Sequence, residues 1–564
     1  MTTFHEPTTG TSLGHRTHDV VNQAPPRVDV DEFTSNVPLV DAVTHYDADW
    51  ALPHLTEVGT LVGTAEFQHA AQRANTELPR LHTHDRYGHR IDEVEYHPAY
   101  HRVIGAAVEH GAHTSAWARP RAGANVARAA TFMLFAQVEA GHACPISMTH
   151  SVVPSLMLAP DLAARWLPRV YSRDYDGALT APADKPGALF GMAMTEKQGG
   201  SDVRANTTVA QRISGDLYAL TGHKWFCSAP MSDAFLVLAQ VPAAAERPED
   251  TGLSCFLVPR ILEDGTRNVF RIQRLKDKLG NKSNASSEIE LDGTLGHLVG
   301  EPGRGVRTII EMVARTRLDC VYGSTAGMRQ SVAEALWHVR HRAAFGATLI
   351  DQPAMTAVVA DLALESEAAT ATALRLARAH DDDASDTEKA FRRLATAVSK
   401  YWICKRGPHH AYEALECLGG NGYTEDFPLA RRYREQPVMA VWEGSGNVIA
   451  LDVLRAMTRE PESVAAFDAE LSRARGASTL FDAHHDRVRS LLGEVAGLDT
   501  GAAQSRARRI AAAMALALQG SLLLQGAPTP VAEAFLAARL GPDRDLEYGS
   551  LPAGTDLAAI LERH

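Results

Sequence analysis

The sequence predicts an α+β protein in which helical segments flank a central antiparallel β domain, with a further helical segment at the C-terminal end. Apolar residues recur at three- and four-residue steps from about residue 43 to residue 173, and this pattern returns after residue 305. Over roughly 187–295, short segments rich in β-branched and aromatic residues alternate with turn signals such as SGD, EDGT and NKSN. No helical pattern interrupts these segments, which favours an antiparallel sheet or barrel over a doubly wound α/β unit.

These patterns divide the 564 residues into five parts. Residues 1–40 are rich in turn-forming and polar residues, and we expect an arm there rather than a core element. The remaining parts are an N-terminal helical domain over 41–186, a β domain over 187–298, a four-helix bundle over 299–458 and a helical appendage over 459–564. Within the last two domains, periodicity predicts helices over 306–344, 353–380, 387–418 and 445–457.

Two connecting or apolar segments need separate interpretation. Residues 380–386 (HDDDASD) are expected to form a solvated connection. The most apolar stretch, 510–524, contains Gln519, Gly520 and Ser521 and is too short to span a bilayer. It therefore predicts a buried helix, and we expect no membrane partner.

The composition limits the partners and the compartment. The formal net charge is −12, so nucleic acid could bind only through a local basic patch. The six cysteines lie far apart without a C-x-x-C pair, which argues against a disulfide framework or a zinc ribbon and suits a reducing compartment. The N-terminus lacks the apolar segment of a secretory signal, so we expect a cytoplasmic protein.

Two segments of the predicted β domain carry glycines and hydroxyl groups. Residues 192–202 (MAMTEKQGGSD) place two adjacent glycines, whose N–H groups could form an anion-binding nest, beside two hydroxyl side chains. A simple strand-to-strand turn explains the same residues. Residues 222–228 (GHKWFCS) place an aromatic side chain beside a hydroxyl and could flank a flat heteroaromatic cofactor. Core packing on a half-buried strand is the alternative.

Two further segments lie in the predicted bundle. Residues 418–423 (LGGNGY) have more glycines than a helix C-cap requires, which indicates close backbone approach to another group. Residues 441–447 (VWEGSGN) place one carboxylate, Glu443, between an aromatic residue and two glycines. An apolar pocket would raise the pKa of Glu443 and make it a usable base. Alternatively, Glu443 complements the dipole of the helix that follows.

The histidines offer only a weak metal-site pattern. His97 and His101 have i,i+4 spacing, and His82, His84 and His89 precede them. No carboxylate or cysteine completes a ligand set, so solvated or helix-capping histidines are the better interpretation, and no metal is predicted.

Together the four segments, in this order, resemble the acyl-CoA dehydrogenase family of flavoproteins, and within it the AidB subgroup of alkylation-response flavoproteins. The resemblance covers nearly the whole chain and includes MTEKQGGSDV, GHKWF, LKDKLGNKSNASSE, RAAFG, ICKRG, LGGNGY and WEGSGN. It implies the fold of that family, with FAD bound between the β domain and the bundle. It also implies a homotetramer built as a dimer of dimers.

The resemblance also implies roles for individual positions. The segment that would line the isoalloxazine and the phosphates contains Met192, Met194, Thr195, Gly200 and Ser201. Thr195 and Ser228 would hydrogen-bond the ring near its N5 and O4 edge, and Phe226 would lie against the ring face. An element reaching FAD from the neighbouring subunit would contain Arg342, Phe345 and Gln352. The adenosine side would contact Glu416, Gly419 and Gly420, and the segment that closes the site contains Trp442, Ser445 and Asn447.

Glu443 aligns with the catalytic base of the family. Oxidation of an unactivated Cα–Cβ bond requires removal of a proton from Cα and departure of a hydride from Cβ to flavin N5, so one base and one flavin suffice without a metal. Some relatives carry the base on the helix after the β domain. That position is Thr316 here, which cannot act as a base, and this favours Glu443.

Two departures from the family pattern bear on the substrate and on DNA. Arg317 matches an arginine that contacts coenzyme A, but the acidic position before it is Ala314, which tells against an ordinary fatty acyl-CoA. The appendage of the AidB group is basic and associated with duplex DNA. Here, residues 460–564 contain 10 Arg, no Lys and 14 acidic residues, and only Arg506, Arg508 and Arg509 cluster, with Arg473, Arg475, Arg487 and Arg489 as companions.

The resulting prediction is an FAD-dependent acyl-CoA dehydrogenase-like oxidoreductase. It would dehydrogenate a short or branched acyl thioester, with an electron-transfer flavoprotein or oxygen as acceptor. Nitroalkane oxidation is disfavoured, because relatives with that activity use an aspartate as the base. The alternative is an AidB-like, DNA-associated protective flavoprotein with weak or vestigial dehydrogenase activity.

Overall fold

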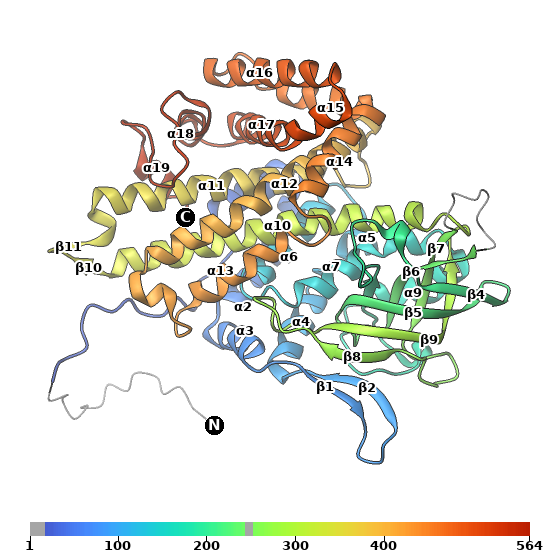
Figure 1. The fold of residues 1–564 in the computed structure, drawn as a ribbon. Helices are drawn as coiled ribbons and strands as arrows, with labels where there is room; N and C mark the ends of the chain where they lie inside the picture. The colour runs from blue at the N-terminus through green and yellow to red at the C-terminus, as the bar shows by residue number, and fades with distance from the viewer. Residues whose placement is uncertain (1–16, 243–251) are drawn as a thin grey trace.

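The computed structural model describes residues 17–242 and 252–564, and it has the predicted order of helical, β and helical parts (Figure 1). Residues 1–16 of the expected arm lie outside the described residues. The long helices of the bundle form the centre, the β domain lies at one end of them, and the appendage covers one side (Figure 1).

The N-terminal part is mainly helical. Its helices are α1 (Val37–His45), α2 (Leu52–Gly63), α3 (Ala65–Thr76), α4 (Pro98–Glu109), α5 (Ser115–Ala118), α6 (Ala124–Ala136), α7 (Ala143–Ser151), α8 (Val153–Leu156) and α9 (Pro160–Val170). The expectation that histidines cap helices is confirmed for His97, whose Nδ1 accepts the Ala99 N–H at 3.1 Å at the start of α4. His101 instead places Nδ1 2.7 Å from the Tyr175 hydroxyl.

An antiparallel hairpin interrupts the helices, where the sequence pattern predicted helix throughout. It pairs β1 (Arg80–His84) with β2 (Arg90–Glu95) and projects from the helices (Figure 1). Asp85 makes its turn by accepting the backbone N–H groups of Tyr87 and His89. This local hydrogen bonding overrides the weak helical periodicity on either side.

The expected arm is wrong for its C-terminal part, which belongs to the core. Phe33 is buried, and Glu32 forms a buried ion pair with Arg27. Helix α1 begins at Val37, inside the predicted arm. Burial of Phe33 and the buried Arg27–Glu32 ion pair therefore anchor a segment whose composition is largely polar.

The β domain contains β3 (Phe190–Ala193), β4 (Val209–Ser214), β5 (Leu217–Ser228), β6 (Ala234–Gln240), β7 (Leu253–Pro259), β8 (Arg271–Leu275) and β9 (Ser286–Val299). The strand order is β3-β6-β4-β5-β9-β7, β8 pairs with β9, and an additional β6–β7 pairing closes the sheet on itself. Most pairings are antiparallel as predicted, but β3 runs parallel to β6 and β4 meets β6 in parallel. The sheet is therefore mixed, because the β4–β5 hairpin separates β3 from its partner in sequence.

The bundle contains α10 (Gly305–His341), α11 (Pro353–Arg378), α12 (Asp386–Glu416), α13 (Pro428–Met439) and α14 (Gly446–Arg459). Four of these lie within about three residues of the predicted spans. Helix α13 was not predicted. Its buried face mixes polar and apolar side chains and the helix contains Pro437, so charged residues interrupt the apolar pattern that a periodicity argument needs; the buried residues are Leu429, Ala430, Arg432, Glu435, Gln436 and Met439.

The connection at 380–386 is not fully solvated. Asp381 is buried, and its carboxylate accepts the backbone N–H groups of Gly123 at 2.9 Å and Asn125 at 2.7 Å. Two of the free N–H groups at the start of α6 are satisfied in this way. The segment that looked like a charged surface loop therefore caps a core helix.

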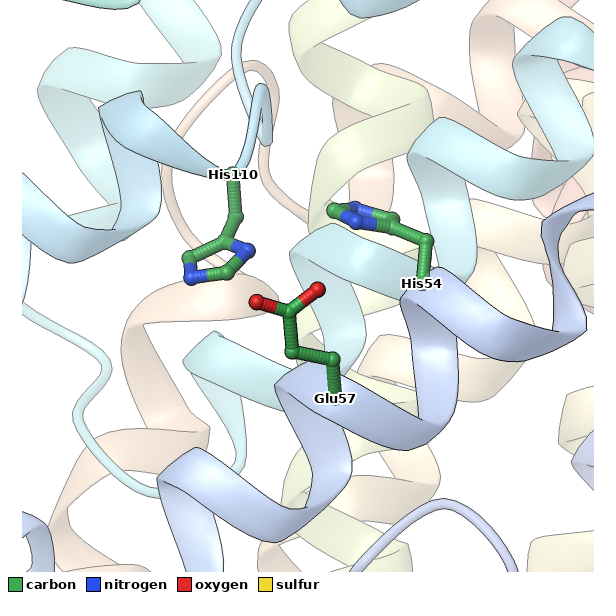
Figure 2. Close-up of side chains that lie close together, drawn as sticks. All are labelled: His54, Glu57 and His110. Carbon is green, nitrogen blue, oxygen red and sulfur yellow. The ribbon is translucent and has the colours of Figure 1, made fainter.

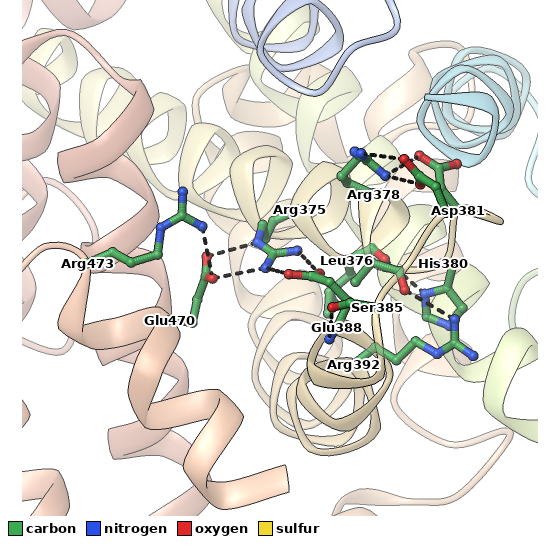
Figure 3. Close-up of polar contacts among 12 residues, drawn as sticks. Arg375, Leu376, Arg378, His380, Asp381, Ser385, Glu388, Arg392, Glu470 and Arg473 are labelled. Carbon is green, nitrogen blue, oxygen red and sulfur yellow. Dashed lines mark hydrogen bonds and ion pairs between the residues drawn. The ribbon is translucent and has the colours of Figure 1, made fainter. Parts of the chain in front are cut away.

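The appendage consists of α15 (Pro461–Ser472), α16 (Thr479–Ala496), α17 (Thr500–Gly526), α18 (Thr529–Leu540) and α19 (Leu557–Leu561). Arg375 of α11 joins it to the bundle by pairing with Glu388 of α12 and Glu470 of α15, as Figure 3 shows. Helix α17 is long and apolar enough to cross a membrane by length and composition. Two thirds of its most apolar window is buried against neighbouring helices, so protein packing accounts for its apolarity.

Candidate active site

Glu443 lies on a tight loop between α13 and α14. Its φ is 57°, in the left-handed region that non-glycine residues rarely adopt, and Gly444 follows with φ 112°. Such a conformation is retained only where surrounding contacts determine it. The loop therefore directs the Glu443 side chain at the expense of local backbone strain.

The Glu443 carboxylate meets α10. The Thr316 hydroxyl donates a 2.8 Å hydrogen bond to Oε2 of Glu443, and the carboxylate is half-buried. Burial raises the pKa of Glu443, while the Thr316 hydrogen bond and then the charges of Arg317 and Lys400 partly oppose the rise. A raised pKa brings a carboxyl group closer to the range of an effective general base.

Two cations hold the backbone of this loop. Lys400 of α12 is buried, and its ammonium donates to the Trp442 carbonyl at 2.9 Å and to the Gly444 carbonyl. Arg317 donates from Nε to the Glu443 carbonyl at 2.8 Å and from Nη1 to Asp452 at 2.9 Å. Arg317, expected to contact substrate, thus lies under the Glu443 loop with its guanidinium already engaged.

An apolar cluster adjoins the loop through Trp442. Buried members of that cluster include Met148, Val152 and Met312, and the half-buried Met192, Met194 and Trp442 pack against it. Trp442 Nε1 is buried and has no hydrogen-bond partner among the described residues. The residue before Glu443 therefore belongs to an apolar cluster, while the Glu443 carboxylate accepts the hydrogen bond from Thr316.

The segment after β3 is organised by a buried ion pair that sequence reasoning missed. Glu196 pairs with Lys224 of β5 at 2.8 Å and also accepts the Thr207 N–H at 2.7 Å. Although burial opposes ionisation of Glu196, the Lys224 ammonium and these hydrogen bonds lower its pKa. At Gly200 an added Cβ would lie 2.5 Å from the Thr195 hydroxyl, so this turn requires a glycine beside that hydroxyl. Ser201 is exposed at the same turn.

The end of β5 presents an exposed ring and a small hydroxyl cluster. Phe226 is 49% exposed. The Ser228 hydroxyl lies 3.1 Å from that of Ser286, which accepts from the Lys278 ammonium at 3.1 Å. Burial lowers the pKa of Lys278 to about 8. The Lys278 ammonium is therefore connected to Ser228 through the hydroxyl of Ser286.

The remaining predicted cofactor residues do not meet Glu443 within one chain. Arg342 follows α10, and Phe345 lies between β10 (Ala343–Ala344) and β11 (Ala347–Thr348), where it is fully exposed. Thr316 lies in the N-terminal third of α10, which at 37 residues is about 55 Å long. Figure 1 places this hairpin at the end of the bundle opposite the β domain.

The other outlying residues are also accessible. The amide of Gln352 donates to the Ala344 carbonyl at 2.8 Å, just before α11. Glu416 ends α12, and an added Cβ at Gly419 or Gly420 would meet open space. Ser445 and Asn447 instead belong with Glu443: Ser445 ends its loop just before α14, and Asn447 in the first turn of that helix accepts a 2.8 Å hydrogen bond from Arg508 of the appendage. The candidate cofactor residues thus form two groups that are separated along the bundle.

Three family models match successive parts of the chain. The AidB N-terminal domain of the adaptive response protein matches residues 22–177, the middle domain of acyl-CoA dehydrogenases matches 191–294, and their C-terminal domain matches 303–458. The putative acyl-CoA dehydrogenase AidB of Escherichia coli is 42% identical over 527 residues, which cover 93% of this chain and 95% of that protein.

The chain belongs to the acyl-CoA dehydrogenase family. Within it, the match to the AidB domain confirms the predicted subgroup. Members of this acyl-CoA dehydrogenase family are FAD-dependent oxidoreductases, which identifies the class of enzyme and its cofactor. The predicted fold is confirmed as well.

Solved structures agree with this family assignment. A crystal structure of Caenorhabditis elegans ACDH-11 in complex with C11-CoA superposes with a TM-score of 0.83 at 26% identity, covering 98% of this chain and 97% of that one. A structure described as the apo form of Bd2924 gives 0.80 at 29% identity, covering 89% and 99%.

Proposed function

We propose that this protein dehydrogenates a short or branched acyl thioester between Cα and Cβ, with Glu443 as the base that removes the Cα proton. The observation that carries the proposal is the placement of Glu443. Its carboxylate is half-buried on a left-handed turn, beside an apolar cluster and under the hydroxyl of Thr316. Burial that raises the pKa of a carboxyl group also strengthens it as a proton acceptor.

The residues near Glu443 fit the isoalloxazine end of FAD. Gly200 lets the backbone pack against the Thr195 side chain with its hydroxyl, Ser228 offers a second hydroxyl, and the buried N–H of Trp442 has no hydrogen-bond partner among the described residues. When bound, FAD supplies the acceptor for the hydride that leaves Cβ. Lys278, linked to Ser228 through Ser286, would place positive charge near the ring edge and favour the gain of negative charge there.

We further propose that a second copy of the chain completes the cofactor site in a homotetramer. The exposed Phe345, with Arg342 and Gln352, would contact FAD of the neighbour, and Glu416, Gly419 and Gly420 would face its adenosine. The length of α10 supports this arrangement, because it keeps Arg342, Phe345 and Gln352 far from Glu443 in their own chain.

The substrate class rests on the apolar cluster and on Arg317. Trp442, Met148 and Val152 already pack in one cluster beside the loop, which favours a short or branched acyl group over a long one. The guanidinium of Arg317 already pairs with Asp452. Any thioester carrier that binds Arg317 would therefore compete with Asp452 for the same group. We therefore propose an acyl thioester whose carrier makes few contacts at this position.

The electron acceptor would be an electron-transfer flavoprotein or oxygen. The six cysteines are buried free thiols, which supports the reducing environment of the cytoplasm as the compartment. The reoxidation rate of the reduced enzyme in air separates the two acceptors. Fast reoxidation would assign oxygen, and slow reoxidation would assign a protein acceptor.

The appendage gives little support to the DNA-associated alternative. Its arginines are largely occupied, because Arg473, Arg475, Arg489 and Arg506 form ion pairs with Glu470, Asp486, Asp468 and Glu494. Arg508 donates to the side chain of Asn447. Phosphate binding needs available cationic side chains, so we place this function second.

An anaerobic titration tests the proposed reaction. Purified flavin-loaded protein is mixed with each member of a panel of short and branched acyl-CoAs. The absorbance of the flavin band at about 450 nm is followed. Bleaching by a branched or short member, with formation of the enoyl product, supports the proposal. Visible flavin that no member of the panel bleaches would contradict it, and retention of duplex DNA at low salt would then favour the alternative.

A further inference from the structure

Two histidines and a glutamate converge on the N-terminal domain, away from Glu443. His54 lies in the first turn of α2, Glu57 lies one turn later, and His110 is the residue that caps the C-terminus of α4. Each offers one ligand atom, and the three atoms lie within 4.8 Å of one another. Figure 2 shows the Glu57 carboxylate between the two imidazole rings.

The fold explains why the three side chains meet. Residues three apart on a helix share one face, so His54 and Glu57 point to the same side of α2. The end of α4 brings His110 opposite them, with 5.5 Å between the two imidazole centroids and 36° between the ring planes. Both histidines are half-buried and Glu57 is exposed, so an ion could enter from solvent.

We propose that His54, Glu57 and His110 bind a divalent transition-metal ion of the Zn²⁺ type. Two imidazole nitrogens and one carboxylate oxygen form a ligand set that zinc uses in proteins, with one position left for water. Calcium and magnesium prefer oxygen ligands and would be bound poorly. Ligand atoms around tetrahedral zinc lie about 3.4 Å apart, so side-chain rotations that bring the atoms closer together by at most about 1.4 Å close the site.

The charges around the site favour an ion that forms coordinate bonds. The guanidinium of Arg173 lies close enough to the His54 ring to act on it electrostatically. The positive charge of Arg173 also opposes any ion that is held by charge alone. Imidazole coordination does not depend on net negative charge, and it selects a zinc-type ion under these conditions.

A second cluster on the same chain provides a matched control. His409, Glu413 and Glu547 also bring their ligand atoms within 4.8 Å. This set has only one imidazole, and His409 already pairs with Glu547 at 3.0 Å. The second cluster therefore matches the first in the spacing of its ligand atoms, but its histidine already has a carboxylate partner within the chain.

Competition with a chromophoric chelator tests the proposal on the untagged, flavin-loaded full chain. Wild type should take up Zn²⁺ at one strong site per chain, and His110→Ala and Glu57→Gln should each weaken that site by more than about tenfold. His409→Ala should leave it unchanged. Equal Zn²⁺ affinity in wild type and His110→Ala would overturn the assignment. A loss of Zn²⁺ affinity in His409→Ala as large as that in His110→Ala would overturn it as well.

Thermal unfolding gives a second readout that does not depend on flavin chemistry. Zn²⁺ should raise the midpoint of wild type and of His409→Ala, because binding to the folded state joins α2 to α4, and Mg²⁺ at the same concentration should not. Glu57→Gln changes an exposed side chain, so its metal-free midpoint should equal that of wild type. A zinc-dependent rise that survives in Glu57→Gln and in His54→Ala would exclude the site.

Discussion

The Thr316 hydroxyl donates a hydrogen bond of 2.8 Å to the Glu443 carboxylate, joining two residues that lie 127 positions apart. One end of this contact is the position where some relatives carry their base, and the other end is the base proposed here. The two alternative positions therefore face the same point in space. In this chain, one of them supplies the carboxylate and the other supplies a hydrogen-bond donor that orients it.

Thr316→Val should shift the pH dependence of flavin reduction upward. The Thr316 hydrogen bond favours the charged form of Glu443, so its loss raises the pKa of Glu443 further. A hydrogen bond to a charged group contributes about 1.5–3 kcal/mol, which corresponds to a shift of about one to two pH units. Rapid-mixing measurements from pH 5 to 9 record the shift. Thr325→Val, a buried substitution elsewhere on α10, should have the same pH profile as wild type. A Thr316→Val profile that does not shift would contradict the orienting role of Thr316.

Lys400→Met should slow flavin reduction without loss of the bound flavin. The substitution removes the donor to the Trp442 and Gly444 carbonyls, so the strained loop loses its support. A displacement of about 1 Å is enough to cost roughly a hundredfold in rate. The reduction rate and the flavin content are measured together. Lys389→Met, at the exposed start of α12, serves as the control, and a wild-type rate in Lys400→Met would show that Lys400 does not position the loop.

Glu470→Ala should weaken the attachment of the appendage. Its loss removes two hydrogen bonds from the buried Arg375 guanidinium, which keeps its pair with Glu388, and a hydrogen bond to a charged group contributes about 1.5–3 kcal/mol. We expect a lower unfolding midpoint and earlier proteolytic cleavage between α14 and α15. Asp486→Ala, which breaks the exposed pair with Arg475, should change the midpoint little. Equal effects of the two substitutions would argue against Arg375 as the anchor.

The order of the domains and the long helices of the bundle could be predicted from the sequence, because their apolar periodicity extends over many turns. Helix α13 could not, since buried charged residues interrupt its few buried apolar positions. The hairpin at 80–95 depends on the Asp85 turn, a short local signal within a longer helical pattern. Asp381 was mistaken for a surface residue because its helix-capping contact is more than 250 positions away.

The candidate site divides in the same way. Glu443 and the glycine-rich segments form continuous motifs, so sequence reasoning could find them. The supporting contacts of Thr316, Lys400 and Asp452 join distant segments, and no local pattern identifies the partners in these contacts. A lysine inside the apolar run TAVSKYWIC is the one signal that could have marked Lys400 as a buried cation. His110 is likewise more than fifty positions from His54, so their convergence depends on the fold.

The central claim is that Glu443 removes the Cα proton, and Glu443→Gln tests it most directly. The amide keeps the size of the side chain and accepts the Thr316 hydrogen bond, but it is not a base at neutral pH. With the acyl-CoA that reduces wild type fastest, anaerobic rapid mixing should show normal flavin content and a reduction rate lower by about 10²- to 10⁴-fold. A reduction rate equal to that of wild type would contradict the assignment of Glu443 as the base.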